Sequence, residues 1–159
     1  MGEAGAIIIS MKITAKSRYA LRILLDIAVH DKGEPRTIKE IAASQGISEK
    51  FISRIAIPLR KAGMVSTERG VNGGLRLARF PKDITLLDIV QSTDGPLALL
   101  NCLARPGTCA RQGKCATENA WGKVNKTLSE SMRSIALSDV IADYRRLTPD
   151  PPKEPDYCI

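Results

Sequence analysis

The chain has 159 residues, of which 43% are hydrophobic, and its formal net charge is +7. This length fits one compact domain with a small appended element. The sequence has no apolar run of about 18 residues, which argues against a membrane span and makes the cytoplasm the expected compartment. Residues 11–80 hold 14 basic and 6 acidic side chains, whereas residues 81–159 hold 10 of each. The excess charge therefore lies in the first half, which favours a nucleic acid or another anionic partner over a basic surface that serves only solubility.

Two helices are expected at the start of the folded part. Residues 1–10 precede a second possible start at Met11 and are treated as an extension, disordered or outside the fold. Residues 16–30 carry apolar side chains at the spacing of an amphipathic helix with one broad buried face. Thr37 and Glu40 have the spacing of a capping box, which predicts the start of a short second helix.

A third helix is expected over residues 49–62, directly after a tight turn. Gly46 can supply the left-handed turn residue, and Ser48 is placed to cap the helix. Pro58 lies inside this stretch and should kink the helix or begin a new turn. Two short capped helices joined by a glycine turn form a helix-turn-helix, whose second helix enters the major groove of DNA.

Two short strands follow and are expected to form a hairpin. Residues 64–69 and 75–79 alternate like strands, and the Asn72-Gly73 pair between them is a strong hairpin-turn signal. A hairpin directly after a helix-turn-helix is a wing. Residues 11–92, which end in one more capped helix, are therefore predicted to be a winged helix-turn-helix DNA-binding domain.

Side chains on the third helix and on the wing are the candidate DNA contacts. Basic side chains on a recognition helix can bond guanine O6 and N7, and a helix N-terminus can bind a phosphate. Glycines permit close approach of the backbone to the duplex. A solvated charged face is the alternative for each residue, but the helix-turn-helix, the wing and the local charge are together far more specific. The candidates are Ser48, Lys50, Ser53, Arg54, Arg60, Arg69, Asn72 and Gly73.

The second half is predicted to hold a sensor segment and a dimerisation element. Residues 93–116 form the cysteine-bearing segment, which starts with an apolar helical turn at residues 97–100. Residues 117–147 are expected to be a long helix and a return helix capped by Ser138. The proline-rich residues 148–159 are expected to be a flexible tail.

The long helix has apolar positions at spacings of three and four residues, as in a coiled coil. A narrow seam of this kind favours dimerisation over packing back onto the same domain. The seam consists of Trp121, Val124, Leu128, Met132 and Ile135.

Cys102, Cys109 and Cys115 are the candidate sensor. Their spacing is C-x6-C-x5-C, in a segment whose glycines and proline would let three thiolates surround one centre. Clustered cysteines in a cytosolic chain indicate metal or redox chemistry more often than disulfides. Basic residues between them would lower thiol pKa values and offset the charge of a thiolate-bound cluster. The spacing by itself supports an iron–sulfur cluster and structural zinc equally, ahead of redox-active or idle thiols.

Glu118, three residues after Cys115, is the candidate fourth ligand, although the helix dipole equally favours an acidic side chain in a first helical turn. His30, the single histidine, is expected to end the first helix rather than to bind a metal. Cys158 lies in the tail and is expected to be a free thiol. With one histidine, no glycine-rich phosphate loop and no paired carboxylates, the sequence argues against an enzyme.

Several motifs in order resemble the Rrf2 family of bacterial winged-helix regulators, and the resemblance covers nearly all of residues 11–147. The matching stretches are residues 17–22, 38–42, 46–48, 58–63, 69–74, 84–90 and 95–97, the three cysteines and residues 137–139.

The resemblance implies a mainly helical fold, with a winged helix-turn-helix head, a β-hairpin wing and a long C-terminal dimerisation helix. It implies a homodimer on a roughly palindromic double-stranded DNA operator, acting as a transcriptional regulator and expected to repress. In cluster-bearing members, three cysteines that match Cys102, Cys109 and Cys115 hold a cluster that senses iron–sulfur status, iron, nitric oxide or redox state. The resemblance therefore favours a [2Fe–2S] or [4Fe–4S] cluster over zinc.

The chain departs from the family pattern at the fourth ligand. The family's cluster-biogenesis regulator has a histidine at the position of Glu118, and its first cysteine gap is one residue shorter. The family's nitric-oxide sensor takes an acidic ligand from the first helix of the partner subunit, where this chain has Arg18. Leu75 replaces the usual aromatic residue after the glycine pair. The cluster type stays open, and a winged-helix regulator with a thiol switch or zinc site is the alternative.

Overall fold

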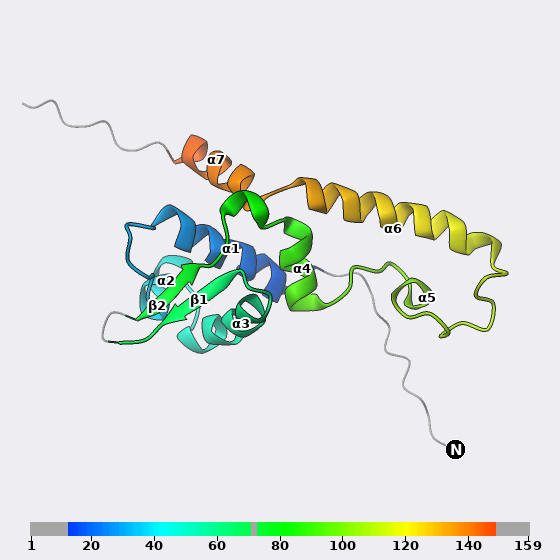
Figure 1. The fold of residues 1–159 in the computed structure, drawn as a ribbon, viewed down its shortest axis with the longest axis horizontal. Coiled ribbons are helices and arrows are strands. Elements are labelled where there is room, and N and C mark those ends of the chain that lie inside the picture. The colour runs from blue at the N-terminus through cyan, green and yellow to red at the C-terminus, as the bar shows by residue number, and fades with distance from the viewer. Residues whose placement is uncertain (1–12, 71–72, 149–159) are drawn as a thin grey trace, which may run out of the picture.

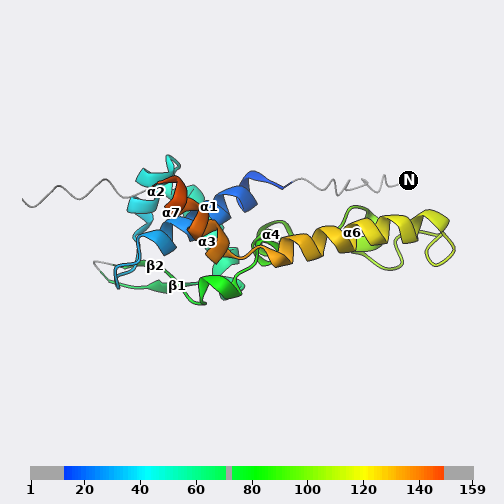
Figure 2. The same cartoon turned by 90° about the horizontal axis from the view of Figure 1, so that it is seen from above.

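The computed structural model describes residues 13–70 and 73–148. A head is built around α1, and the long helix α6 extends away from it (Figures 1 and 2). The expected fold class is confirmed, because the described residues form a mainly helical molecule with one two-stranded antiparallel sheet. The elements in chain order are α1 (Ala15–Val29), α2 (Ile38–Gln45), α3 (Glu49–Lys61), β1 (Val65–Glu68), β2 (Gly74–Leu77), the 3-10 turn η1 (Pro81–Asp83), α4 (Leu86–Asp94), α5 (Asn101–Ala104), α6 (Ala116–Ser134) and α7 (Leu137–Leu147).

The core of the head forms where the apolar faces of α1, α2 and α3 meet. Helix α1 lies at the centre and contacts α2, α3, α4, α7 and β2. Apolar side chains at spacings of three and four share one face of a helix, so each helix brings a buried stripe to this junction. The fully or almost fully buried side chains are Ala20, Ile23, Leu24, Ile41, Ile52, Ile55 and Leu59.

The predicted caps of α2 and α3 are confirmed. Thr37 accepts a hydrogen bond from the Glu40 amide at 3.2 Å, and its own amide donates to the Glu40 carboxylate at 2.9 Å. Gly46 ends α2 in the left-handed conformation with φ of 65°. Ser48 accepts from the Phe51 amide at 3.2 Å and so caps α3. These bonds satisfy backbone groups without a partner inside the helix, and they fix the turn between α2 and α3.

The wing is a short hairpin whose base is joined to the head. β1 and β2 pair antiparallel, with Val65 opposite Leu77, and both are shorter than the predicted strands. Leu75 exchanges two backbone hydrogen bonds with Arg36, at 2.8 and 2.9 Å. Leu75 is also 1% exposed. A leucine therefore fills this place in the core without the aromatic residue that is usual in the family.

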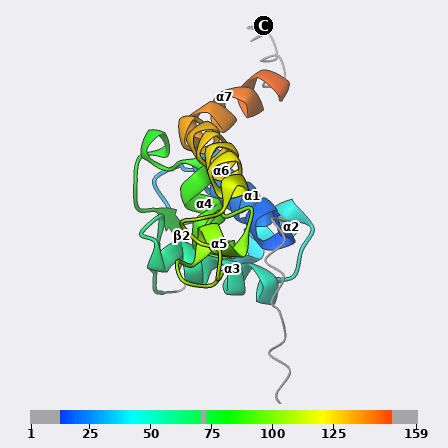
Figure 3. The same ribbon diagram turned by 90° about the vertical axis from the view of Figure 1, so that its right-hand side faces the viewer.

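The C-terminal end of α6 packs against α4 in a second, smaller apolar cluster. Met132 is 7% exposed there and packs with Leu87, Val90 and Leu97. The chain then turns back, and α7 packs against α1 and η1. Helix α7 lies on the opposite side of the head from α3 (Figures 1 and 3).

One prediction about backbone conformation is wrong. Residues 97–100 are not helical, because the side chain of Asn125 bonds their backbone, and the short helix α5 begins only after them. Pro58 lies within α3, which continues through it to Lys61, and the Ala62 amide donates to the Pro58 carbonyl at 3.0 Å.

The junction between α6 and α7 also differs from the prediction. Ser138 does not cap the return helix, since Ala136 precedes it and the Ala136 amide donates to the Asp139 carboxylate at 2.8 Å. Ile135 lies just past α6, so the predicted seam ends at Met132 within the helix. No helix in the described part of the chain is long and apolar enough to cross a membrane.

Candidate DNA-reading surface and cysteine segment

The outer face of α3 carries most of the predicted DNA contacts. Lys50, Arg54 and Arg60 are exposed. Lys50 and Arg54 are four residues apart and share one side of the helix, whereas Arg60 lies nearer its C-terminal end. Within the described residues, none of the three forms an ion pair. Ile57 lies between them and is 48% exposed. The Ser53 hydroxyl donates to the Glu49 carbonyl at 2.9 Å, so only its lone pairs are free to face a ligand.

The inner face of α3 holds the helix in one orientation. Its apolar side chains are buried against α1, and Phe51 meets Tyr19 edge to face, with ring centroids 5.5 Å apart at 88°. The Arg22 guanidinium lies 5.2 Å from the Tyr19 ring centroid. Aromatic pairs of this geometry add to the stabilisation from burial, so the exposed basic face of α3 is rigidly presented.

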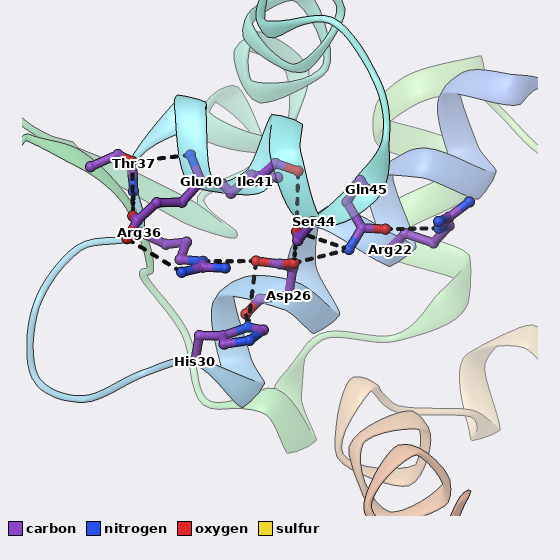
Figure 4. A network of polar contacts seen from close by, with 9 residues as sticks. All are labelled: Arg22, Asp26, His30, Arg36, Thr37, Glu40, Ile41, Ser44 and Gln45. Atoms are coloured by element: carbon purple, nitrogen blue, oxygen red, sulfur yellow. Dashed lines mark hydrogen bonds and ion pairs between the residues drawn. The ribbon is translucent and has the colours of Figure 1, made fainter. Parts of the chain in front are cut away.

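One buried carboxylate, Asp26, joins α1, α2 and the root of the wing (Figure 4). Its oxygens accept from Arg36 Nε at 3.0 Å, from Gln45 Nε2 at 2.9 Å and from the Ser44 hydroxyl. Gln45 also accepts from Arg22 Nε at 2.8 Å. Since the Arg36 backbone pairs with β2, this carboxylate links the helix-turn-helix to the wing.

Burial by itself would raise the pKa of Asp26, but the hydrogen bonds from Ser44, Gln45 and Arg36 outweigh it and lower that pKa. Asp26 is not among the residues predicted from the sequence to be functional. A signal was present, since Asp26 lies three residues after Ile23 on the apolar face of α1, and a buried charge needs partners. His30 ends α1 as predicted, with Nδ1 2.9 Å from the Asp26 carbonyl oxygen.

The wing carries the other candidate DNA contacts, Arg69, Asn72 and Gly73. Arg69 follows β1 directly and is exposed. Asn72 lies outside the described residues. A Cβ on Gly73 would lie 2.5 Å from the Glu68 carbonyl oxygen and 3.0 Å from the Gly70 carbonyl oxygen. Glycine is therefore required there for the hairpin to close, and its role at DNA stays a prediction.

The three candidate cysteines lie on different local structures. Cys102 is half-buried in α5, Cys109 is exposed in a turn, and Cys115 immediately precedes α6. All three are free thiols. In the described residues, no three His, Cys, Asp or Glu side chains gather closely enough to hold a metal ion. The donors suit a thiolate-bound cluster in kind, but the segment would have to close around it.

Helix α6 begins with two interactions that bear on this segment. Glu118, the candidate fourth ligand, accepts from the Gly113 amide at 3.0 Å and so folds the turn before Cys115. A hydrogen bond with the Thr117 hydroxyl, with Sγ and Oγ1 3.2 Å apart, lowers the pKa of Cys115, and the Thr117 and Glu118 amides add to this. A thiol at a helix N-terminus is thus more readily a thiolate, which is the reactive and metal-binding form.

A helix-turn-helix with a basic outer face, followed by a wing, defines a winged-helix transcriptional regulator. The chain belongs to the Rrf2 family, whose model, described as an iron-dependent transcriptional regulator, matches residues 13–143. It is 37% identical over 133 residues to protein rrf2 of Nitratidesulfovibrio vulgaris, covering 84% of this chain and 89% of that protein. It is 31% identical over 133 residues to the HTH-type transcriptional regulator IscR of Vibrio parahaemolyticus, covering 84% and 79%. The family and these relatives are transcriptional regulators and not enzymes.

Two solved structures share this fold. CymR of B. subtilis, a global cysteine regulator, matches with a TM-score of 0.70 and 29% identity over 84% of this chain and 98% of that one. T. potens IscR matches with a TM-score of 0.67 and 33% identity over 87% and 91%. Both likenesses cover more than four fifths of this chain, which supports the predicted fold class.

Proposed function

We propose that the protein represses transcription by reading an operator with α3 and the wing. The observation that carries this proposal is the set of exposed basic side chains on α3, Lys50, Arg54 and Arg60, on a helix fixed by its buried face. Cations without ion pairs can neutralise phosphates or bond guanine. Ile57 offers an apolar contact for a thymine methyl group, and Ser48 lies where a helix N-terminus can meet a phosphate.

Selection from random duplexes, followed by affinity measurements over a range of salt concentrations, tests this surface. Arg54→Ala or Arg69→Ala should cost about 1–3 kcal/mol of binding free energy if the residue reads a base or the minor groove. The log–log salt slope of the wild type should be roughly −0.9 per phosphate contacted. Lys82→Ala is the control: it removes a basic side chain from η1, beside α7, and should leave the affinity for DNA almost unchanged. Wild-type affinity for DNA in Arg54→Ala and Arg69→Ala would show that neither arginine belongs to the DNA-binding surface.

We further propose that two copies associate through the free part of α6. Trp121 and Val124 are 46% and 51% exposed, whereas Leu128 and Met132 of the same seam pack within the chain. An apolar stripe left open on a projecting helix is suited to a second copy. A twofold dimer would present two α3 helices to a palindromic operator.

We also propose that Cys102, Cys109 and Cys115 hold an iron–sulfur cluster, with the fourth ligand open. Support comes from three free thiols on one short segment and from the 33% identity to T. potens IscR. A bound cluster would make the state of the protein depend on the supply of iron and sulfide and on oxidants. The chain's own contribution is to place the three thiols next to α6, which leads to the head.

Anaerobic purification with an absorption spectrum and iron and sulfide assays tests the cluster. We expect a brown protein with matched iron and sulfide, and loss of the colour in Cys102→Ala, Cys109→Ala and Cys115→Ala. A colourless protein after anaerobic reconstitution, with zinc or no metal, would overturn the cluster while leaving DNA binding intact.

One observation favours a thiol switch as the second candidate. The lowered pKa of Cys115 increases its thiolate fraction, and the thiolate is the form that oxidants attack. Under this candidate, the cluster-free protein would form a mixed disulfide with oxidised glutathione fastest at Cys115. Mass spectrometry of each cysteine checks the order, and equal rates at Cys109 and Cys115 would argue against it.

A further inference from the structure

The chain that leads to the cysteines is held at its start by Asp94, the last residue of α4. The Asp94 carboxylate accepts from the Thr14 amide at 3.1 Å, from the Thr14 hydroxyl at 2.6 Å and from the Ser17 hydroxyl at 2.5 Å. Thr14 is the N-cap of α1. These bonds fasten the end of α4 to the first turn of α1, the central helix of the head.

A few residues later, the same chain is held by Asn125, which lies on α6. Asn125 Oδ1 accepts from the Leu99 amide at 2.9 Å, and Asn125 Nδ2 donates to the Leu97 carbonyl at 3.2 Å. One side-chain amide thus satisfies a donor and an acceptor two residues apart, as a neighbouring strand would. Asn125 lies 26 positions after Leu99 and 28 positions after Leu97 in the sequence. The two hydrogen bonds therefore fix residues 97–99 against α6.

Apolar packing supports the same placement. Leu97 is 9% exposed and Ala98 is 4% exposed, and Leu97 packs with Met132 of α6 in the second cluster. The backbone polar groups at this point are partly shielded from water, where an unmet hydrogen bond is costly. The Asn125 amide therefore anchors residues 97–99 to α6 through partly buried hydrogen bonds, and it is not a surface contact.

Both ends of the cysteine segment are consequently attached to α6. Cys102 follows Leu99 by three residues, and Cys115 immediately precedes the first turn of α6. Asn125 lies ten residues beyond Cys115, about 15 Å along the helix axis at 1.5 Å per residue. A change in the arrangement of the thiols therefore acts on α6 through Cys115 at one end of the segment. At the other end it acts on the hydrogen bonds between Asn125 and residues 97–99.

We propose that Asn125 is a positioning residue of the sensor. It sets the position of Cys102 relative to α6. It also transmits a change in the cysteine segment through residues 95–99 to Asp94, which is bonded to the start of α1. This inference rests on the proposed sensing function and adds the residue through which that function would reach the DNA-reading head.

Thiol alkylation of the full-length, cluster-free protein tests the fastening without any cluster. Asn125→Asp keeps the shape and removes the donor to Leu97, and Asn125→Ala removes both bonds. In each variant we expect iodoacetamide to modify Cys102 about five- to tenfold faster than in wild type, the factor set by about one hydrogen bond. Cys109, which is already exposed, should change less than about twofold. Ser129→Ala, one turn further along α6, loses only a bond to its own helix and is the matched control.

Operator affinity tests the transmission. The quantity measured is the ratio of Kd values for the apo protein and for the protein reconstituted anaerobically with iron and sulfide. Asn125→Asp should bring this ratio at least about fivefold closer to one than in wild type and Ser129→Ala, each measured below its thermal midpoint, where the protein is folded. A wild-type ratio far from one that Asn125→Asp preserves, or an unchanged Cys102 rate, would overturn this inference alone. A wild-type ratio of one would overturn the sensing function together with it.

Discussion

At the scale of single residues, the DNA-reading head depends on polar side chains in buried places. Asp26 is 4% exposed, yet it accepts hydrogen bonds from Ser44 and Gln45 of α2 and from Arg36 at the wing root. A buried charge is tolerated only when its partners are in place. Removing one acceptor should therefore affect α1, α2 and the wing together.

Asp26→Asn should lower the free energy of unfolding by about 1–3 kcal/mol at neutral pH, because Arg36 and one other donor lose an acceptor. The folded state lowers the pKa of Asp26 below its ordinary value of 3.8. The stability that this carboxylate contributes is thus present above that value and is lost as pH falls through the folded pKa.

Denaturant unfolding of both proteins from about pH 7 to about pH 2 measures the effect. The stability difference between wild type and Asp26→Asn should be full at neutral pH and shrink below about pH 4. Asp31→Asn, on an exposed residue nearby, is the control and should stay within about 0.5 kcal/mol of wild type. A difference that stays constant over the whole range would contradict the role of the ionised carboxylate.

At the scale of elements, the wing and the head touch so closely that one position admits no side chain. A Cβ on Gly74 would lie 2.6 Å from the Arg36 carbonyl carbon and 2.9 Å from the Thr37 amide nitrogen. Both atoms belong to the backbone that carries the capping box of α2. β2 would have to move away from the helix-turn-helix to accept an added methyl group.

Gly74→Ala should therefore destabilise the protein by about 1–3 kcal/mol and weaken DNA binding, because the wing loses its place. Gly122→Ala on α6 is the matched control, since nothing lies within 4 Å of its added Cβ. Alanine is the better helix former, so this variant should gain up to about 1 kcal/mol. Thermal unfolding and operator affinity compare the two, and a Gly74→Ala protein of wild-type stability would disprove the close contact.

At the scale of the whole molecule, α6 serves two surfaces. Its C-terminal half packs on α4 of the same chain, and its N-terminal half extends away from the head (Figure 1). Trp121 and Val124 on the N-terminal half are exposed. Packing on its own domain, one of the two alternatives for this seam, therefore holds for the C-terminal half of α6, and dimerisation is proposed only for the N-terminal half. The cysteine segment lies beside the open half.

Replacing Trp121 or Val124 by glutamate should shift the protein from dimer to monomer, because a charge cannot be buried against a second copy without a partner. Operator affinity should fall with it, since two half-sites are no longer bound by one particle. Sedimentation measures the mass, and Lys123→Glu, an exposed change on another side of α6, is the control. A Trp121→Glu protein with the same mass as wild type would place the interface elsewhere.

Local features of this protein could be predicted from the sequence because their causes lie within a few residues. The capping box at Thr37, the left-handed Gly46 and the Ser48 cap depend only on neighbouring backbone groups. The buried stripes of α1 and α3 follow from the helical period. These signals place the helix-turn-helix and, with the basic charge, its outer face.

Tertiary structure decided everything that needs residues distant in sequence. The Asp26 network, the contact of Gly74 with Arg36 and the fastening of Leu99 by Asn125 all join segments ten or more residues apart. No local pattern states which far segment will supply a partner. For the same reason the apolar stretch at residues 97–100 looked helical. A side chain from α6 satisfies its backbone there, and that bond competes with the helix only after the chain has folded.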